Sequence, residues 1–441
     1  MGSVRRWVAA LGFALVTALG ALSPQPAAAS PDETLDALRT WYRLVLELVR
    51  HTPTYSPPVA SRSFAYLGVT AFESVATGSD QLQSLAGQLP GLTPLPAREK
   101  GLVYDNSVLV QAAMAYAAQN FFSNTGPIGQ RAMTSLHKKL RAEVTTAVPP
   151  DVIERSEALG EAIAKHVLAW SQNDGGAVIT NMGFPLEYDL TTGPSAWVPT
   201  SLIAQQQKPL LPKWGTNRPF ALPDVSKCDL PPPPAYSEDK TSEFYKQALE
   251  VYDAKKNLTP EQRAIARFWS DDPMLSPTPP GHWISIALQV LKAGNATPER
   301  SVDVLARVGI AMADAFIGNW RTKYQYNLLR PITYIRRVID PKWEPVLNTP
   351  PFPEYPSGHS TQSGAAATVL TDLFGENFVF DDGTHEADGM PTRSYPSFWA
   401  AAEEAGISRL YGGIHFRAAI DQGLAQGRCI GAFTNALKTR K

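Results

Sequence analysis

Three short segments between residues 323 and 415 contain basic and histidine side chains that could bind an oxyanion. The first contains Lys323 and Arg330, the second reads Ser357-Gly358-His359, and the third contains Arg409 and His415. Ammonium and guanidinium groups neutralise an anion, and a guanidinium can donate two parallel hydrogen bonds to it. Histidine can transfer a proton or act as a ligand or nucleophile. The sequence therefore predicts an oxyanion-binding enzyme.

The spacing of Lys323 and Arg330 indicates how the first segment would position its charges. A separation of seven residues is two turns of an α-helix, so both side chains are expected on nearly the same face. Pro331 follows directly and limits how that helix continues.

The other two segments are expected at helix ends. Ser357 precedes a run of good helix formers, so its hydroxyl and the N–H groups of Gly358 and His359 should lie at a helix start, where free donors and the helix dipole favour an anion. Gly412-Gly413 predicts a turn after Arg409, with His415 opening the C-terminal helix.

The three motifs, K-x6-R-P, P-S-G-H and S-R-x5-H, occur here in order. They resemble the signatures of the superfamily that joins type 2 phosphatidic acid phosphatases, bacterial acid phosphatases and vanadium-dependent haloperoxidases. The long helical N-terminal part and the proline-rich middle are similar to the haloperoxidase branch. This resemblance implies a vanadate cofactor, and phosphate, a near isostere, could occupy the same site.

The resemblance also implies roles for individual residues. In a haloperoxidase, vanadium would be bonded to His415, His359 would act as acid–base, and Lys323 would polarise bound peroxide. Hydrogen peroxide and halide would be the substrates, and the hypohalous acid formed would react with a small organic acceptor. In a phosphatase, His415 would instead be the nucleophile and His359 would protonate the leaving group. The vanadate-binding set implied is Lys323, Arg330, Ser357, Gly358, Arg409 and His415.

One position departs from the family pattern. Relatives commonly carry an acid four residues after the last histidine, where this chain has Ala419, and Asp421 should point away from His415 on a helix. We therefore expect a backbone carbonyl to hold the His415 ring. Because a nucleophilic histidine gains from a carboxylate on its other nitrogen, Ala419 favours the haloperoxidase over the phosphatase. A third class, a protein that only binds an oxyanion, would have no use for His359.

Two aromatic residues bear on the choice of halide. Trp320 lies about one helical turn before Lys323, and Phe352 lies on the loop before Ser357. They resemble the Trp and Phe of chloride-oxidising family members, whereas bromide-preferring relatives often carry histidine at the second position. This pair predicts bromide oxidation and leaves chloride oxidation open. The alternative is that both rings only pack in the core.

The first 29 residues are typical of a secretory signal peptide. Arg5-Arg6 precede an apolar run, and Ala27–Ala29 offer small residues for cleavage. We expect a secreted or periplasmic protein, with a retained membrane anchor as the alternative. No later apolar stretch is long enough to span a membrane. The formal net charge of −1 gives no electrostatic footprint for nucleic acid.

Helical spacing of apolar residues dominates the rest of the chain and predicts a mainly α, large helical-bundle protein with little or no sheet. Residues 30–441 are expected to form a single haloperoxidase-like domain, with the oxyanion site in 320–441. A proline-rich stretch at 194–234 cannot be regular helix, and its apolar residues suggest that it wraps the surface. Lys323–Ile339 is expected to continue one helix, and Asp381–Pro396 to form a small hairpin.

The cysteines and the remaining histidines give weaker signals. Cys228 and Cys429 could form one disulfide or remain two buried thiols. His282 follows Pro-Pro-Gly and is interpreted as a helix cap. Residues 381–389, which include His385, are rich in metal-ligand types, but their spacing does not match an EF-hand and a polar turn is favoured. Core or surface roles are expected for His51, His137 and His166.

Overall fold

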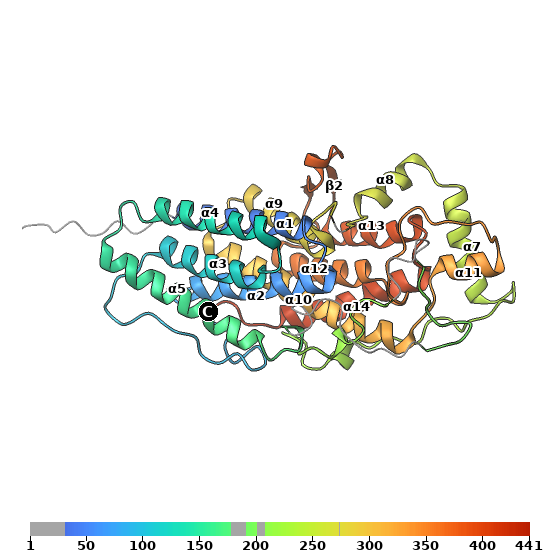
Figure 1. The fold of residues 1–441 in the computed structure, drawn as a ribbon, viewed down its shortest axis with the longest axis horizontal. Coiled ribbons are helices and arrows are strands. Elements are labelled where there is room, and N and C mark those ends of the chain that lie inside the picture. The colour runs from blue at the N-terminus through green and yellow to red at the C-terminus, as the bar shows by residue number, and fades with distance from the viewer. Residues whose placement is uncertain (1–30, 178–190, 201–207, 273) are drawn as a thin grey trace, which may run out of the picture.

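The computed structural model describes residues 31–177, 191–200, 208–272 and 274–441. In this part of the chain the fold is mainly α, and the longer helices run along the long axis of an elongated molecule (Figure 1). The predicted fold class is thus confirmed. The predicted signal peptide lies outside the described residues. No described helix is both long enough and apolar enough to cross a membrane.

The N-terminal helices gather at one end of the molecule, and the later helices extend from among them to the other end (Figure 1). The N-terminal helices are α1 (Pro31–Arg50), α2 (Pro57–Ala76), α3 (Asn106–Phe121), α4 (Gly126–Val144) and α5 (Pro150–Ser171). The later helices are α7 (Glu243–Lys256), α8 (Pro260–Phe268), α9 (Thr278–Ala293), α10 (Pro298–Tyr326), α11 (Pro331–Val338), α12 (Gly358–Phe374), α13 (Phe398–Tyr411) and α14 (Arg417–Asn435). Short 3-10 turns are η1 (Trp214–Thr216), η2 (Val225–Cys228) and η3 (Glu386–Asp388).

Helix α10 lies at the centre and packs against α2, α9, α12 and α14. Residues on all sides of this helix are buried over most of its length, so it has no polar face exposed to solvent there. The contact with α2 is close because glycine lies on both sides of it. A Cβ on Gly68 would come within 2.9 Å of the Ala306 Cα, and a Cβ on Gly309 within 3.0 Å of the Phe64 carbonyl oxygen.

Helices α12 and α14 also pack through glycine. A Cβ on Gly427 would lie 2.1 Å from the carbonyl oxygen of Thr361, and one on Gly423 would lie 2.9 Å from that of Ser357. In addition, the Ser357 N–H donates to the Ala419 carbonyl over 2.9 Å. The start of α12 is therefore fixed directly against the first turns of α14.

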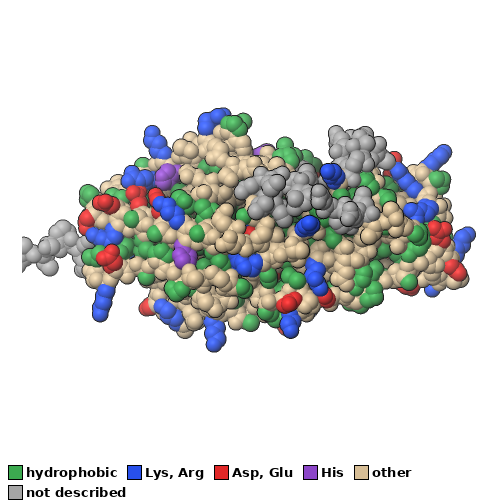
Figure 2. Space-filling model, turned by 60° about the horizontal axis from the view of Figure 1, so that its bottom comes forward, with side chains coloured by type: hydrophobic (Ala, Val, Ile, Leu, Met, Phe, Trp, Pro, Cys, Tyr) green, Lys and Arg blue, Asp and Glu red, His purple; other side chains and the backbone are tan. Residues whose placement is uncertain are grey.

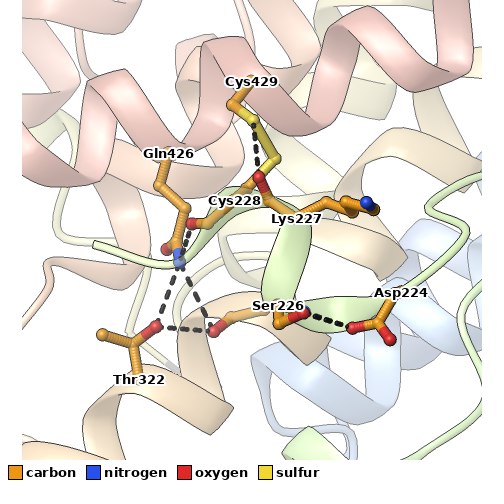
Figure 3. Close-up of a disulfide and its surroundings, with 8 residues drawn as sticks. Asp224, Ser226, Lys227, Cys228, Thr322, Gln426 and Cys429 are labelled. Carbon is orange, nitrogen blue, oxygen red and sulfur yellow. Dashed lines mark hydrogen bonds between the residues drawn. A yellow bond between two sulfur atoms is a disulfide. The ribbon is translucent and has the colours of Figure 1, made fainter.

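The described parts of the proline-rich stretch lie against the helices. Its buried apolar side chains are Trp197, Leu210, Leu211, Trp214, Phe220 and Leu222. Cys228, in η2, forms a disulfide with Cys429 of α14, which resolves the two alternatives left by the sequence (Figure 3). The amide of Gln426 donates to the Thr322 hydroxyl over 3.1 Å and to the Cys228 carbonyl over 3.3 Å, so α10, η2 and α14 meet at this point.

The predicted hairpin is present as β1 (Phe380–Asp382) and β2 (Arg393–Tyr395), which pair antiparallel with Phe380 opposite Tyr395. Lysine and arginine side chains are scattered over the face shown in Figure 2 and form no continuous patch there.

Candidate active site

Lys323 and Arg330 do not lie on one helix, so the prediction of a continuous helix over Lys323–Ile339 is wrong. Helix α10 ends at Tyr326, and Asn327 adopts a left-handed conformation with φ 44°. Arg330 is the N-cap residue of α11, with Pro331 in its first turn. Asparagine tolerates this backbone conformation better than most residues, and proline is well suited to the first helical turn. The chain therefore breaks between the two cations.

Arg330 is fully buried, and only part of its guanidinium is hydrogen-bonded. Nε donates to the Phe352 carbonyl (2.8 Å) and Nη1 to the Ile414 carbonyl (2.9 Å), while Nη1 also lies 3.1 Å from His415 Nε2. Nη2 is buried with no hydrogen-bond partner. Burial lowers the pKa of Arg330 to about 10, and the neighbouring Glu354 opposes this shift.

Lys323 is also fully buried, but it points into the loop that precedes α12. Its Nζ donates to the carbonyls of Pro353 (2.9 Å), Glu354 (3.0 Å) and Pro356. Burial, and then Arg330, lower the pKa of Lys323 well below its usual value, while Glu354 favours the charged form. In this conformation its three ammonium donors are all used by the loop, so Lys323 supplies positive charge and fixes the loop.

The start of α12 has the predicted geometry. Ser357 is the N-cap residue and its hydroxyl accepts a hydrogen bond from the Ser360 N–H over 3.3 Å. Gly358 and His359 are the first two helical residues, so their N–H groups have no intrahelical acceptor. Such groups can bind an anion at the N-terminus of a 17-residue helix.

Arg409, on α13, joins His359 to this site. Its Nη1 lies 3.0 Å from His359 Nε2 and donates to the Ser270 carbonyl over 3.3 Å. Its Nε and Nη2 are buried without a hydrogen-bond partner. Burial, and then the charge of Arg409, lower the pKa of His359 to about 4. His359 is therefore neutral over the mildly acidic and neutral range.

The ring of His415 is oriented by a carboxylate that the sequence reasoning missed. His415 Nδ1 lies 2.9 Å from Glu354 Oε1, which also accepts the Phe416 N–H over 2.8 Å. The expectation of a backbone carbonyl in this role is wrong. Because the carboxylate accepts the Nδ1 proton, Nε2 is left with its lone pair facing Arg330.

Two other expectations for His415 also change. The histidine precedes the N-cap residue Phe416 and does not open α14, which begins at Arg417. A glycine turn does separate it from Arg409, with Gly413 at φ 76°. The residue that could have been found from the sequence is Glu354, the one acid in the segment 350–356, three residues before Ser357.

A cavity of about 350 Å³ connects His359, Arg409 and His415 to the predicted aromatic residues. The cavity is lined by Gly358, His359, Arg409, His415, Trp320 and Phe352 among others. The rings of Trp320 and Phe352 are 4.9 Å apart, and the Phe352 ring lies over the guanidinium of Arg330 at 4.9 Å and over Lys323 Nζ at 5.2 Å. Both rings therefore border the space beside the cations as well as packing against each other.

A second group of polar side chains lies buried next to His359. His282 Nδ1 lies 3.0 Å from Asp271 Oδ1 and its Nε2 lies 2.8 Å from Asp382 Oδ2. The interpretation of His282 as a helix cap is wrong, because it lies inside α9 and is fully buried. Burial alone would lower the pKa of His282, but Asp271 and Asp382 raise it to about 10.

Residues 383–389, after β1, form a turn that includes η3, as expected, and one side chain of this turn is buried. His385, from this segment, is 4% exposed and its Nε2 lies 3.6 Å from Asp271 Oδ1. Asp271, His282 and His385 could together hold a metal ion. The other histidines have the modest contacts expected of them: His51 lies near Glu47, His137 near Gln111 and His166 near Thr93.

Comparison with known proteins places this site in a family. A family model described as the VCPO second helical-bundle domain matches residues 303–440, which include all three motifs. A crystal structure described as that of the first bacterial vanadium-dependent iodoperoxidase is 39% identical in sequence. It covers 95% of this chain and 99% of its own, with a TM-score of 0.85. The chain belongs to the vanadium-dependent haloperoxidase family.

More distant haloperoxidases share the fold or the sequence pattern. Vanadium chloroperoxidase from Curvularia inaequalis is 24% identical over 503 residues, covering 89% of this chain and 81% of the relative. The structure of an apo-type bacterial vanadium-dependent chloroperoxidase is 16% identical with a TM-score of 0.67, covering 87% of this chain and 95% of its own. At that identity the similarity supports the fold alone.

Membership of the haloperoxidase family implies peroxidase activity towards halide and a vanadate cofactor. The donors at this site fit such an oxyanion. Arg330 Nη2 and Arg409 Nη2 are buried without hydrogen-bond partners, and the N–H groups at the start of α12 are free of intrahelical acceptors. Buried donors of this kind are costly unless a ligand accepts their hydrogen bonds.

Proposed function

We propose that this protein is an exported haloperoxidase that holds vanadate between α10, α12, α13 and α14 and uses hydrogen peroxide to oxidise halide to hypohalous acid. The hypohalous acid would then react with a small organic acceptor. The observation that carries the proposal is the group of unpartnered buried guanidinium donors beside a histidine whose Nε2 lone pair is exposed to them.

The proposed cofactor-binding residues contribute in different ways. Arg330 and Arg409 would donate hydrogen bonds from the nitrogen atoms that have no protein partner, and Ser357 and Gly358 would add the hydroxyl and the N–H at the start of α12. Each cation within about 4 Å of an anionic oxygen contributes on the order of 4 kcal/mol at an effective dielectric constant near 20. Lys323 would add positive charge and hold the loop, and it could polarise peroxide only after its ammonium group releases one of the loop carbonyls.

His415 is the proposed ligand of vanadium. Glu354 accepts the Nδ1 proton, which fixes the tautomer and leaves Nε2 free to bind. When bound, vanadate would act as a Lewis acid that activates hydrogen peroxide towards halide.

His359 is the proposed acid–base residue. It lines the cavity, and because its pKa is lowered to about 4 it can accept a proton from incoming peroxide under mildly acidic conditions. Arg409 holds the ring from one side over 3.0 Å.

Iodide is the halide that we propose is oxidised most readily, followed by bromide. Support comes from the relative described as an iodoperoxidase, which is 39% identical over nearly the whole chain. Iodide is also the easiest of the three halides to oxidise. The aromatic pair Trp320 and Phe352 borders the site, so bromide oxidation is retained from the sequence prediction and chloride oxidation stays open.

One argument against the phosphatase alternative no longer holds, but no observation adds support for a phosphatase. Ala419 had favoured the haloperoxidase because it left His415 without a carboxylate, but Glu354 supplies one. A Glu-oriented histidine could serve as a nucleophile as well as a metal ligand. The preference therefore rests on the relatives, which are haloperoxidases.

The decisive experiment measures both activities on one preparation. Purified protein freed of vanadate is titrated with orthovanadate while triiodide formation from iodide and peroxide is followed, and hydrolysis of p-nitrophenyl phosphate is measured in parallel. We expect halide oxidation to appear with vanadate and any phosphatase activity to fall. Arg330→Met should weaken the response, and Arg336→Met, on the same helix α11 but bonded to the Trp343 carbonyl, is the control. Efficient ester hydrolysis without halide oxidation at any vanadate level would support the phosphatase.

A further inference from the structure

Asp271, His282 and His385 form a buried cluster that the proposed halide chemistry does not use. Asp271 lies in the loop between α8 and α9, His282 on α9, and His385 between β1 and η3. Their exposed fractions are 2%, 0% and 4%. Three elements that are distant in sequence thus bring a carboxylate and two imidazoles together inside the protein.

The distances in this cluster suit a small divalent cation. One ligand atom from each residue can be chosen so that all three lie within 4.8 Å of one another. Asp271 Oδ1 is 3.0 Å from His282 Nδ1 and 3.6 Å from His385 Nε2. Donors bonded to tetrahedral zinc at about 2.0–2.1 Å lie roughly 3.3 Å apart. The two separations measured from Asp271 bracket this value.

The outward nitrogen of each histidine is held by its own carboxylate. His282 Nε2 lies 2.8 Å from Asp382 Oδ2, and His385 Nδ1 lies 3.0 Å from Asp388 Oδ2. Metal-binding histidines almost always donate their second ring N–H to such a group, which fixes the tautomer and raises the basicity of the ligating nitrogen. Both inward nitrogen atoms then face the same residue, Asp271.

A hydrogen-bonded network without a metal ion explains only part of this arrangement. A protonated His282 between Asp271 and Asp382 would satisfy all three side chains. It leaves His385 Nε2 buried without a hydrogen-bond partner, because Asp271 is too far away at 3.6 Å. A cation would bind the lone pair of this buried nitrogen.

We propose that Asp271, His282 and His385 form a site for a divalent cation of the zinc class, separate from the oxyanion site. Two imidazole nitrogens and one carboxylate oxygen favour zinc or a similar transition metal over calcium or magnesium, which prefer oxygen ligands. Asp271 lines the cavity, which gives the ion a path of entry. Because Asp271 Oδ2 also lies 3.7 Å from His359 Nε2, the bound cation would fix a group that contacts the proposed acid–base residue.

The test uses the full chain purified through a tag without histidine and dialysed against a chelator. Zinc is titrated by calorimetry, and cobalt by its visible absorption, which reports tetrahedral coordination. We expect one zinc per chain and a tetrahedral cobalt spectrum. His385→Gln should weaken zinc binding at least tenfold, while His51→Gln, at an exposed histidine near Glu47, should leave it unchanged.

Two more variants distinguish zinc bound at this cluster from zinc bound elsewhere on the protein. Asp388→Asn keeps all three ligands and alters the outer partner of His385, together with the ion pair that Asp388 makes with Arg50, so a roughly 10–100-fold loss of affinity is expected. His415→Ala should keep the zinc, which excludes binding at the oxyanion site. Circular dichroism verifies folding for every variant. The proposal is overturned if folded wild type binds no zinc, if both His385→Gln and Asp388→Asn bind it normally, or if only His415→Ala loses it.

Discussion

Replacing Glu354 with glutamine would separate the charge of this residue from its hydrogen bonds. Glu354 is fully buried, and its Oε1 accepts from His415 Nδ1 and from the Phe416 N–H. The amide oxygen of glutamine can accept both bonds, so the loop and the His415 tautomer should be retained. What is lost is the negative charge that makes the imidazole a better ligand.

The expected size of the effect follows from the single bond between Glu354 and His415. A hydrogen bond to a charged partner contributes about 1.5–3 kcal/mol and a neutral one about 0.5–1.5 kcal/mol. The difference of about 1–1.5 kcal/mol corresponds to roughly tenfold weaker vanadate binding. Because His359 is untouched, the rate at saturating vanadate should change less than the affinity.

The assay is a vanadate titration of the vanadate-free protein by calorimetry, with recovery of iodide oxidation as a second readout. Glu250→Gln is the matched control. Glu250 bonds to Arg417, two residues after His415, but does not contact the imidazole. The Glu250→Gln variant should bind vanadate with the affinity of the wild type.

Unchanged or tighter vanadate binding in Glu354→Gln would refute the reasoning. Such a result would mean that repulsion between this carboxylate and the incoming anion outweighs its support of His415. Glu354 would then serve mainly as a counter-charge for Arg330 and Lys323, both of whose pKa values it raises.

Three further predictions concern other parts of the molecule. His415→Ala should abolish vanadium-dependent turnover and leave weak anion binding. His359→Ala should retain vanadate and lose roughly 10²–10⁴-fold in rate. Equal vanadate affinity in titrations and equal loss of rate in steady-state assays of the two variants would contradict these roles. Phe352→His should change the ranking of iodide, bromide and chloride in steady-state assays, and an unchanged ranking would remove the ring from the argument. Burial raises the pKa of Glu73 from 4.5 to about 7, so the folded protein binds this proton more tightly than the unfolded chain. The associated stability, up to about 3 kcal/mol, is present below pH 4.5 and lost as the pH rises through 7. Glu73→Gln should make the melting temperature depend less on pH over this range. A pH profile of the melting temperature parallel to that of the wild type would count against this prediction.

The helical class and the motif residues could be predicted from the sequence because both depend on local patterns. Apolar spacing marks helices, and the Ser357 cap with free N–H groups follows from residues that are adjacent in the chain. The path between Lys323 and Arg330 could not be predicted in this way. Seven-residue spacing fits one helix equally well, and the break depends on the single left-handed residue Asn327.

Side-chain contacts between residues far apart in the sequence could not be predicted. Glu354 reaches a histidine 61 residues later, and His282 bonds to Asp382 across 100 residues. Neither pairing leaves a local pattern, although Glu354 itself stands out as the one acid in the segment 350–356. The expected acid was sought on the helix that follows His415, at Ala419, whereas the loop before α12 supplies it.

The glycine contacts between α12 and α14 determine how far apart two of the motifs are. One helix begins beside Ser357 and His359, and the other follows His415, so any change in the spacing of the helices also moves these groups apart. At Gly427 a single methyl group would meet the Thr361 carbonyl oxygen at 2.1 Å. In a mutational scan scored by activity, such glycines would register as strongly as residues that touch the substrate. Because these glycines have no side chain, they allow the close approach of α12 and α14. The positions of the groups at the site therefore depend on residues that do not themselves contact it.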